Sequence, residues 1–240
     1  MRYIRKLPEP SELKQWKKDN AATPQNLCYG NLPGKVNEAV KRNLLQEQGF
    51  VCAYTMRRLS GLKDCHIEHV LAQNAAREED LEYANMAACF PGNGGDTSHG
   101  YGAPIKAGTK VAHNDNFVSP HNPGCEQRFR YDKKGAISAA KGDRAAESAI
   151  GILKLNHGKL VDLRRGAIEA HGLALRHGST RKARKPISAA EARRFAEKVL
   201  EPSPEGRLEP FCVALSQVAL EYADKEEARS DRMKARYRVP

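Results

Sequence analysis

Two imidazoles and a carboxylate lie within four positions of this chain, at His66, Glu68 and His69. If the segment is extended, its side chains alternate between two faces, so His66 and Glu68 share one face and His69 points to the other. This division suits metal-assisted phosphodiester cleavage, in which one group holds a cation while its neighbour takes a proton from the attacking water. Asn85 could position that base, and His99 could supply a second metal ligand.

A less specific interpretation of the same segment stands beside this one. A His-x-Glu-His tetrapeptide occurs by chance, and a single histidine is more often a surface or hydrogen-bonded residue than a ligand. The zinc-protease helix motif HExxH is absent here. Ser60-Gly61 upstream and Gln73-Asn74 downstream favour a turn, then an extended segment from residue 66 to 69, then a loop.

Several short motifs around this segment resemble the HNH endonuclease superfamily, whose small nuclease core is built as a ββα-metal unit. The closest resemblance is to the PtuB-type branch found in Septu and retron-linked anti-phage systems, and it covers about residues 35 to 165. The motifs are Cys52-Ala53-Tyr54-Thr55-Met56-Arg57, His66-Ile67-Glu68-His69, Asn85-Met86-Ala87-Ala88-Cys89, Ser98-His99-Gly100, Lys106 and Asn122-Pro123-Gly124-Cys125.

The resemblance implies a metal centre. Glu68 matches the acidic metal ligand of the family and His99 matches its second ligand. A divalent cation between them would polarise the scissile phosphate and stabilise the leaving oxygen. Mainly oxygen coordination favours Mg²⁺ or Mn²⁺, and the imidazole also permits Zn²⁺ or Ni²⁺.

The resemblance also implies the catalytic residues. His69 matches the general base, and Asn85 matches the asparagine that fixes the loop bearing it. Lys106 matches a lysine expected near the substrate phosphate. His66 matches the first histidine of the motif, and either touches the metal or supports the site.

A structural zinc is not expected, although the family has one. Its four cysteines would stand at positions matching Cys52, Thr55, Cys89 and Gly100, and two of these are not cysteine. Tetrahedral structural zinc needs four nitrogen or sulfur donors. We therefore interpret Cys52 and Cys89 as small buried apolar residues, with a rescue of the site by Cys65 or a histidine as the alternative.

The charge balance favours a polyanionic partner. The chain holds 40 Lys and Arg against 29 Asp and Glu, a net charge of +11. Such an excess attracts phosphate backbones without distinguishing DNA from RNA, and basic proteins also bind acidic proteins. The densest basic cluster is either a solvated linker or a loop that contacts phosphate. It consists of Arg181, Lys182, Arg184 and Lys185.

The chain divides into three regions by composition. Residues 1–34 form a basic, Pro-rich arm whose Trp16 we expect to pack on the core. Residues 35–142 would hold the HNH ββα-metal core with its adjoining loops, and residues 143–240 a helical region that binds a partner or substrate. The fold class predicted is therefore α+β and mainly helical, with the nuclease core between helical N- and C-terminal regions.

Local patterns predict individual elements. Apolar spacing indicates a helix over residues 35–48 that stops at Gly49, and a hairpin is expected around residues 129–137. Further helices are expected over 144–155, 160–175 and 208–229. Ser188 and Glu191 form a capping-box sequence that opens another helix, through residue 200.

The chain shows no sign of a membrane or secreted protein. It has no run of 18 apolar residues, no apolar signal-peptide core after its charged first residues, and six scattered cysteines without a disulfide pattern. We expect a cytoplasmic protein that does not contact a membrane. It lacks GxxxxGK(S/T), so ATP control would come from a partner. The resemblance implies an ABC-class ATPase of the PtuA type, and for retron-linked systems a reverse transcriptase with its msDNA.

These observations lead to one hypothesis and two alternatives. The hypothesis is a metal-dependent HNH endonuclease that cleaves DNA, or RNA such as tRNA, as the effector of a prokaryotic anti-phage complex. One alternative is a nucleic-acid-binding module with a degenerate nuclease core. The other is a scaffold that bridges an ATPase to further subunits.

Overall fold

The computed structural model describes residues 1–71, 80–107, 109, 111, 116–173 and 187–236. Over these ranges the chain is mainly helical, with two small antiparallel sheets, which agrees with the predicted α+β, mainly helical fold class. The helices are α1 (Ser11–Asp19), α2 (Gly34–Glu47), α3 (Ala103–Lys106), α4 (Arg144–Ile152), α5 (Gly158–Ala170), α6 (Ala189–Lys198) and α7 (Cys212–Arg236). The strands are β1 (His66–His69), β2 (Met86–Cys89), β3 (Phe129–Tyr131) and β4 (Ile137–Ala139).

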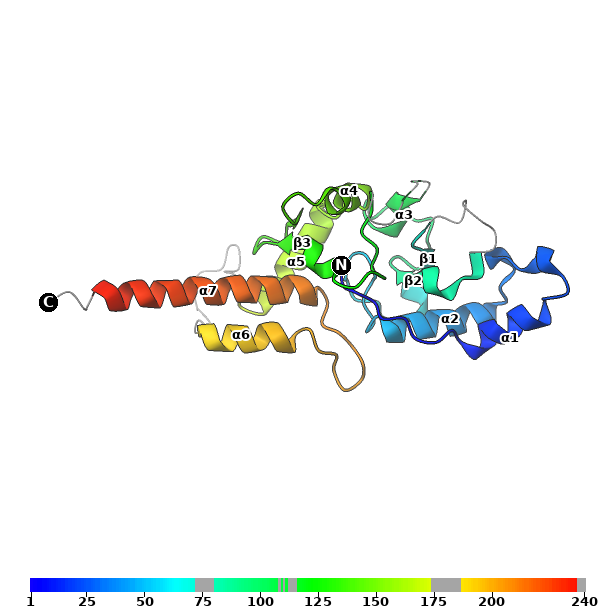
Figure 1. Ribbon diagram of the computed structural model, residues 1–240, viewed down its shortest axis with the longest axis horizontal. Helices are drawn as coiled ribbons and strands as arrows, with labels where there is room; N and C mark the ends of the chain where they lie inside the picture. Colours follow the sequence, from blue (N-terminus) through cyan, green and yellow to red (C-terminus); the bar gives the residue numbers. More distant parts are fainter. Residues whose placement is uncertain (72–79, 108, 110, 112–115, 174–186, 237–240) are drawn as a thin grey trace.

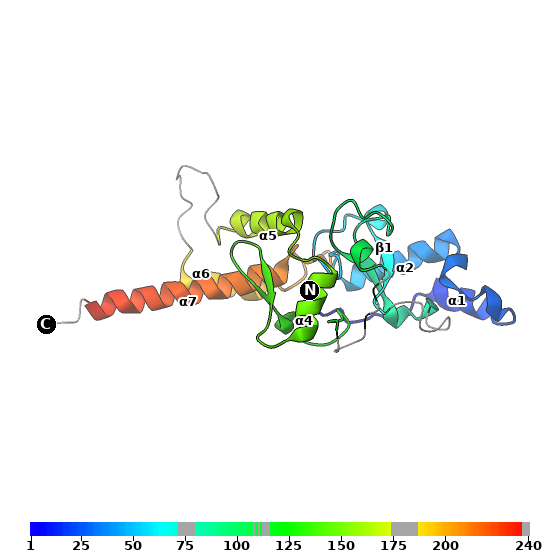
Figure 2. The same cartoon turned by 90° about the horizontal axis from the view of Figure 1, so that it is seen from above.

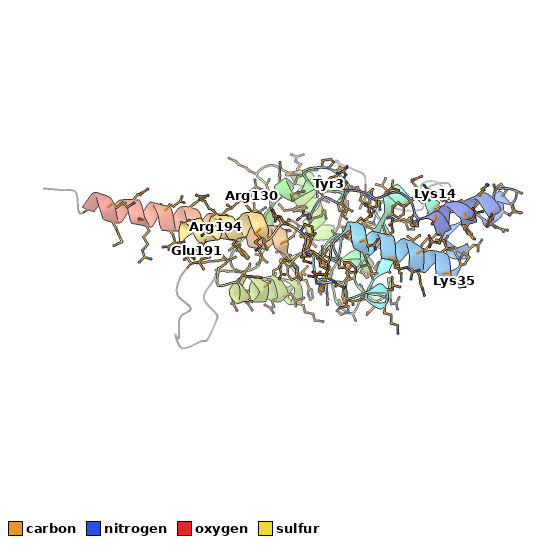
Figure 3. The ribbon with its side chains drawn as sticks, turned by 90° about the horizontal axis from the view of Figure 1, so that it is seen from below. Tyr3, Lys14, Lys35, Arg130, Glu191 and Arg194 are labelled. Atoms are coloured by element: carbon orange, nitrogen blue, oxygen red, sulfur yellow. The ribbon has the colours of Figure 1, made fainter. Side chains whose placement is uncertain are left out.

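The molecule is elongated. Helices α1 and α2 lie at one end, the strands and α3 to α5 form the middle, and α7 extends to the other end beyond its neighbour α6 (Figure 1, Figure 2). The labelled side chains follow this order: Lys14 and Lys35 lie on α1 and α2, whereas Glu191 and Arg194 lie on α6 (Figure 3). Among the described residues, no helix combines the length and apolar character needed to cross a bilayer.

Helix α2 forms where apolar spacing predicted it. Val36, Val40 and Leu44 are buried along one face, which packs this helix beside β2. The helix ends at Glu47, and Gly49, two residues further on, has a φ of +58°, in the left-handed region that glycine adopts without steric cost. A Cβ at this position would also meet the side chain of Leu208 at 2.5 Å, so the turn and the packing both favour glycine.

The N-terminal arm contains more structure than its composition indicated. It includes α1, with Leu13 fully buried, and two short 3₁₀ turns at Pro24–Asn26 and Tyr29–Asn31. Trp16 is partly buried and packs against the core, as predicted. The arm is therefore docked on the core through Leu13 and Trp16.

The chain from β3 onward follows the local patterns, except at the start of its last helix. Strands β3 and β4 form the predicted hairpin, and the side chain of Asn156 both donates to and accepts from the backbone of Ile137. Ser188 and Glu191 make the reciprocal hydrogen bonds of a capping box at the start of α6. Helix α7 is displaced from its prediction, beginning at Cys212 and continuing to Arg236.

Candidate active site

The strand β1 carries the candidate residues, and β2 fixes it from one side. The two strands pair antiparallel, with Glu68 opposite Ala87 and His69 opposite Met86. The other edge of β2 is held by the side chain of Gln48, whose amide accepts from Ala88 N–H at 2.7 Å and donates to Ala88 C=O at 2.8 Å. A buried side-chain amide thus continues the ladder on this edge of the sheet, which has two strands within the described residues.

The side chains of β1 alternate as the extended interpretation requires. Ile67 and His69 are buried, whereas His66 and Glu68 are partly exposed on the opposite face. Two groups able to bind a cation therefore lie together on one face, and the candidate base lies on the other. This geometry agrees with the expected division of the segment.

Glu68 uses its two carboxylate oxygens differently. Oε1 accepts from Lys106 Nζ at 2.7 Å and from the Tyr54 hydroxyl at 3.4 Å, whereas Oε2 lies 3.7 Å from His66 Nε2, beyond hydrogen-bond length. Burial raises the pKa of the Glu68 carboxyl, but His66 and Lys106 outweigh burial and hold the pKa below its ordinary value. Glu68 is therefore an ionised carboxylate near neutral pH.

His66 is held in one orientation. Its Nδ1 lies 2.5 Å from the carbonyl oxygen of Pro91, and because a carbonyl oxygen only accepts, Nδ1 carries the proton. In the neutral ring the lone pair is then on Nε2, the atom that faces Glu68. Burial lowers the pKa of His66, but the nearby Glu68 carboxylate and the hydrogen bond to Pro91 raise it above its ordinary value.

His69 is the buried histidine of the pair. Its Nε2 lies 2.9 Å from the carbonyl oxygen of Asp80, so Nε2 donates and the lone pair of the neutral ring is on Nδ1. The ring of Tyr29 meets the imidazole edge-on, with 5.0 Å between ring centroids. Burial lowers the pKa of His69 below its ordinary value, which favours the neutral, basic form.

Asn85 fixes the chain that leaves β1. Its side chain accepts from Leu71 N–H at 2.8 Å and donates to Leu71 C=O at 3.2 Å, while its backbone carbonyl accepts from Val70 N–H at 2.9 Å. Three hydrogen bonds thus join Asn85 to the two residues that follow His69. The expectation that Asn85 binds backbone beside the candidate base is met by these contacts.

Lys106 lies deeper than a phosphate-contacting lysine needs to. Only 5% of the surface of Lys106 is exposed. Its ammonium donates to Glu68 Oε1 at 2.7 Å and to the backbone carbonyl of His69 at 2.9 Å. The structure brings Lys106 to the candidate site, but its charge is directed at Glu68.

His99 is not joined to Glu68. Its ring packs on Phe90 with 4.6 Å between centroids and lies 6.2 Å from the ring of Tyr101, and its Nε2 is 3.8 Å from an oxygen of Asp96. Within the described part of the chain, no hydrogen bond or ion pair connects His99 to Glu68. The pairing of His99 with Glu68 on one cation stays a prediction from the resemblance.

Cys52 and Cys89 are fully buried next to each other. Burial raises the pKa of Cys52, but hydrogen bonds from Cys89, Thr55 and the backbone lower it to about 5, and Phe90 N–H donates to Cys52 Sγ at 3.4 Å. Burial raises the pKa of the Cys89 thiol well above its ordinary value. In the described ranges, no group of three or more His, Cys, Asp and Glu residues is arranged to hold a metal ion.

Two other expectations concern the fourth zinc position and the basic cluster. The position matching the fourth zinc ligand, Gly100, faces the ring of His157, and a Cβ there would lie 2.7 Å from its Nε2. A cysteine would therefore not fit at residue 100 without a shift of that ring. The basic cluster of Arg181, Lys182, Arg184 and Lys185 lies outside the described residues.

Several residues of the site were not singled out from the sequence. The hydroxyl of Tyr54, the ring of Tyr29 and the backbone carbonyls of Asp80 and Pro91 each contact a histidine or the carboxylate. Backbone carbonyls leave no trace in residue type, so no sequence signal marks Asp80 or Pro91. Tyr54 lies within a quoted motif and could have been found there.

Comparisons with protein-family models and with curated proteins find no match to this chain.

Proposed function

We propose that this protein is a metal-dependent endonuclease of the HNH type that hydrolyses phosphodiester bonds of nucleic acid, with DNA favoured over RNA. One observation carries the proposal: an ionised carboxylate and a neutral imidazole follow each other on β1 and point to opposite faces. The net charge of +11 supports a polyanionic substrate.

The proposed mechanism assigns each side chain one task. His69 takes a proton from the attacking water at Nδ1, because its Nε2 proton is committed to the Asp80 carbonyl. Asn85 holds the two residues after His69 and thereby keeps the imidazole aimed. Glu68 would hold a divalent cation, which when bound neutralises charge on the phosphate and on the leaving oxygen. Lys106 orients the carboxylate through Oε1.

The biological setting is a second layer of the proposal. Resemblance to the PtuB-type branch supports a role as a cytoplasmic effector in anti-phage defence, with an ABC-class ATPase of the PtuA type as partner. A retron reverse transcriptase with its msDNA is the further partner in that setting. Two features support these partners: the net charge of +11, which suits a nucleic acid, and the long C-terminal helix α7, which offers a surface to a protein.

Cleavage of plasmid DNA and of tRNA with Mg²⁺ or Mn²⁺ tests the activity. His69→Ala removes the base and is expected to lower the rate by about 10² to 10⁴, the usual cost of losing a general base. Glu68→Gln is expected to lower it by at least about a hundredfold, since metal stabilisation of charge is worth several kcal/mol. Equal activity in the wild type and His69→Ala would refute the assignment of the base.

One observation favours a binding module with a degenerate nuclease core instead. The ammonium of Lys106 already neutralises Glu68, which a fold without a metal also requires. In that case the wild type would shift nucleic acid in a gel without cleaving it at any metal concentration. His69→Ala would then bind with the affinity of the wild type, and neither protein would produce cleavage products.

A further inference from the structure

We infer that His66, and not His99, is the second protein ligand of the cation, paired with Glu68 through Nε2 and Oε2. The inference rests on the proposed function in supposing that a divalent cation binds at β1. It assigns the cation to the partly exposed face of this strand, opposite the face of His69.

The spacing of the two donor atoms supports this pair. His66 Nε2 and Glu68 Oε2 are 3.7 Å apart, too far for a hydrogen bond between them. Two donors that each lie ~2.1 Å from one cation are roughly 3.0–3.4 Å apart at octahedral to tetrahedral angles. A contraction of a few tenths of an ångström would bring both atoms into coordination, which a side-chain rotation within one strand can supply.

The orientation of the His66 ring is the one that a metal ligand requires. Ligating histidines almost always donate their other ring N–H to a carbonyl or carboxylate, which fixes the tautomer and the ring plane. Here Nδ1 donates to the carbonyl of Pro91, and the backbone at Gly94 packs on the ring, where a Cβ would lie 2.9 Å from Cδ2. Both contacts leave Nε2 directed at the carboxylate.

The carboxylate is prepared in a matching way. Lys106 and Tyr54 both bind Oε1, so that one oxygen is saturated and the other is left facing the imidazole. Glu68 would then bind a cation through Oε2 alone. The two protein ligands leave the remaining coordination positions to water and substrate phosphate, as hydrolysis requires.

His99 has contacts that compete with such a role. Its ring is packed against Phe90, and its Nε2 is 3.8 Å from an oxygen of Asp96, a different carboxylate from that of Glu68. His66 already lies beside Glu68, since the two residues are separated by one position on the regular strand β1, so no backbone movement is needed to bring them together. The geometry therefore selects the histidine inside the strand.

Mn²⁺ binding to the full chain tests the assignment independently of cleavage. An imidazole ligand imposes ¹⁴N coupling on bound Mn²⁺, which pulsed electron paramagnetic resonance detects. His66→Gln is expected to abolish this coupling and to weaken Mn²⁺ binding by at least about tenfold, whereas the matched control His99→Gln keeps both. Loss of the coupling in His99→Gln, with retention in His66→Gln, would overturn the inference.

A measurement on the unmutated protein covers the case in which His66→Gln does not fold. Zn²⁺ added to ¹⁵N-labelled protein is expected to shift the Nε2 resonance of His66 and to leave that of His99 in place. A shift at His99 alone overturns the inference. The absence of any shift, with no Mn²⁺ bound at millimolar concentration, overturns it as well.

The inference and the proposed function fail in different ways. Cleavage that depends on Mn²⁺ and on His69, together with ¹⁴N coupling that survives in His66→Gln, refutes the ligand assignment alone. Mn²⁺ bound through His66, with no cleavage of DNA or RNA, supports the ligand assignment and refutes the nuclease. These two results cannot be confused, because one is read on the bound ion and the other on the nucleic acid.

Discussion

Glu68 and Glu47 are both carboxylates paired with a lysine and a tyrosine at the sheet of β1 and β2, yet their surroundings differ. Glu47 Oε1 accepts from Lys6, and Oε2 accepts from the Tyr83 hydroxyl at 2.8 Å and from Leu7 N–H at 2.9 Å. Its side chain is 0% exposed, against 16% for Glu68. Burial raises the pKa of Glu47, whereas the pKa of Glu68 is lowered.

The difference separates a structural carboxylate from one suited to binding a ligand. Every oxygen of Glu47 receives a donor, and Lys6 extends the cluster to the carbonyl of Met86 on β2, so it fastens the N-terminal arm to this sheet. Glu68 retains an oxygen that faces only the imidazole of His66 within the described residues. A buried Glu–Lys pair alone thus does not show whether a carboxylate is structural or able to bind a ligand. The number of donors on each of its oxygens does.

The largest expected effect is on stability. Glu47→Gln is expected to lower the free energy of unfolding by about 3 kcal/mol, because donors face both oxygens and the new amide NH₂ must oppose one set while Lys6 loses its counter-ion. Glu68→Gln also leaves the buried ammonium of Lys106 without its counter-ion, but its amide oxygen can keep the Lys106 hydrogen bond and its NH₂ can face His66, so we expect a smaller cost of about 2 kcal/mol. Urea denaturation of both variants measures this.

The comparison can be broken by the same two variants. Equal destabilisation by Glu47→Gln and Glu68→Gln would show that the unshared oxygen of Glu68 is not the relevant difference. Retention of Mn²⁺ binding by Glu47→Gln, at a temperature where it is folded, is the matching result on function. Loss of binding there would make Glu47 part of the metal site.

A smaller effect is expected from the two tyrosines. Tyr83→Phe removes a 2.8 Å hydrogen bond to the Glu47 carboxylate and the one that Asn43 donates to the hydroxyl, so it should cost about 1.5 kcal/mol. Tyr54→Phe removes a 3.4 Å contact to Glu68 and should cost less than about 0.5 kcal/mol. Thermal unfolding monitored by circular dichroism compares them, and a larger loss in Tyr54→Phe would reverse the ranking.

The smallest effect is a pair of opposite pH dependences. The pKa of Glu68 lies below its ordinary 4.5, so its contribution to stability is present above pH 4.5 and is lost as pH falls through the lowered value. Burial raises the pKa of Glu47, so the folded state favours the protonated carboxyl. This preference stabilises the fold fully below pH 4.5 and is lost as pH rises through the raised value. Carboxyl ¹³C titration without metal should place the pKa of Glu68 below 4.5 and the pKa of Glu47 above it. A higher pKa for Glu68 than for Glu47 would contradict the comparison.

Local patterns predicted much of the fold because they act over short distances. The helix predicted over residues 35–48 is observed at Gly34–Glu47, and the extended segment His66–His69 is observed with its alternation intact. The capping box at Ser188 and Glu191 is confirmed in its hydrogen bonds. In each case the residues that determine the structure are neighbours in the chain.

Tertiary contacts explain where those patterns failed. Phe211 has a φ of +59° and its N–H donates to the carbonyl of Met56, so α7 begins at Cys212 instead of residue 208. Helix α1 was missed because Leu13 and Trp16 are its only large apolar residues, too few for a periodic signal.

The candidate site shows the same division. The shared face of His66 and Glu68 follows from strand geometry and was predictable, whereas the binding of Asn85 to the chain after His69 was expected only from the resemblance to the HNH superfamily. The contacts of Lys106 with Glu68 span 38 positions and decide which carboxylate oxygen is occupied, which no local pattern reveals. For His99, packing on Phe90 sets its position.

The outward reach of α7 has a hydrodynamic consequence. A helix of 25 residues is roughly 38 Å long, and its far part extends beyond α6 along the longest dimension of the molecule (Figure 1). Such a body tumbles more slowly end over end than about its own axis, and it sediments with a higher frictional ratio than a sphere of equal mass. Amide relaxation rates will therefore depend on bond direction. The N–H bonds of α7 lie along the long axis and reorient only through the slow end-over-end tumbling, so their rates will differ systematically from those of the β3–β4 hairpin.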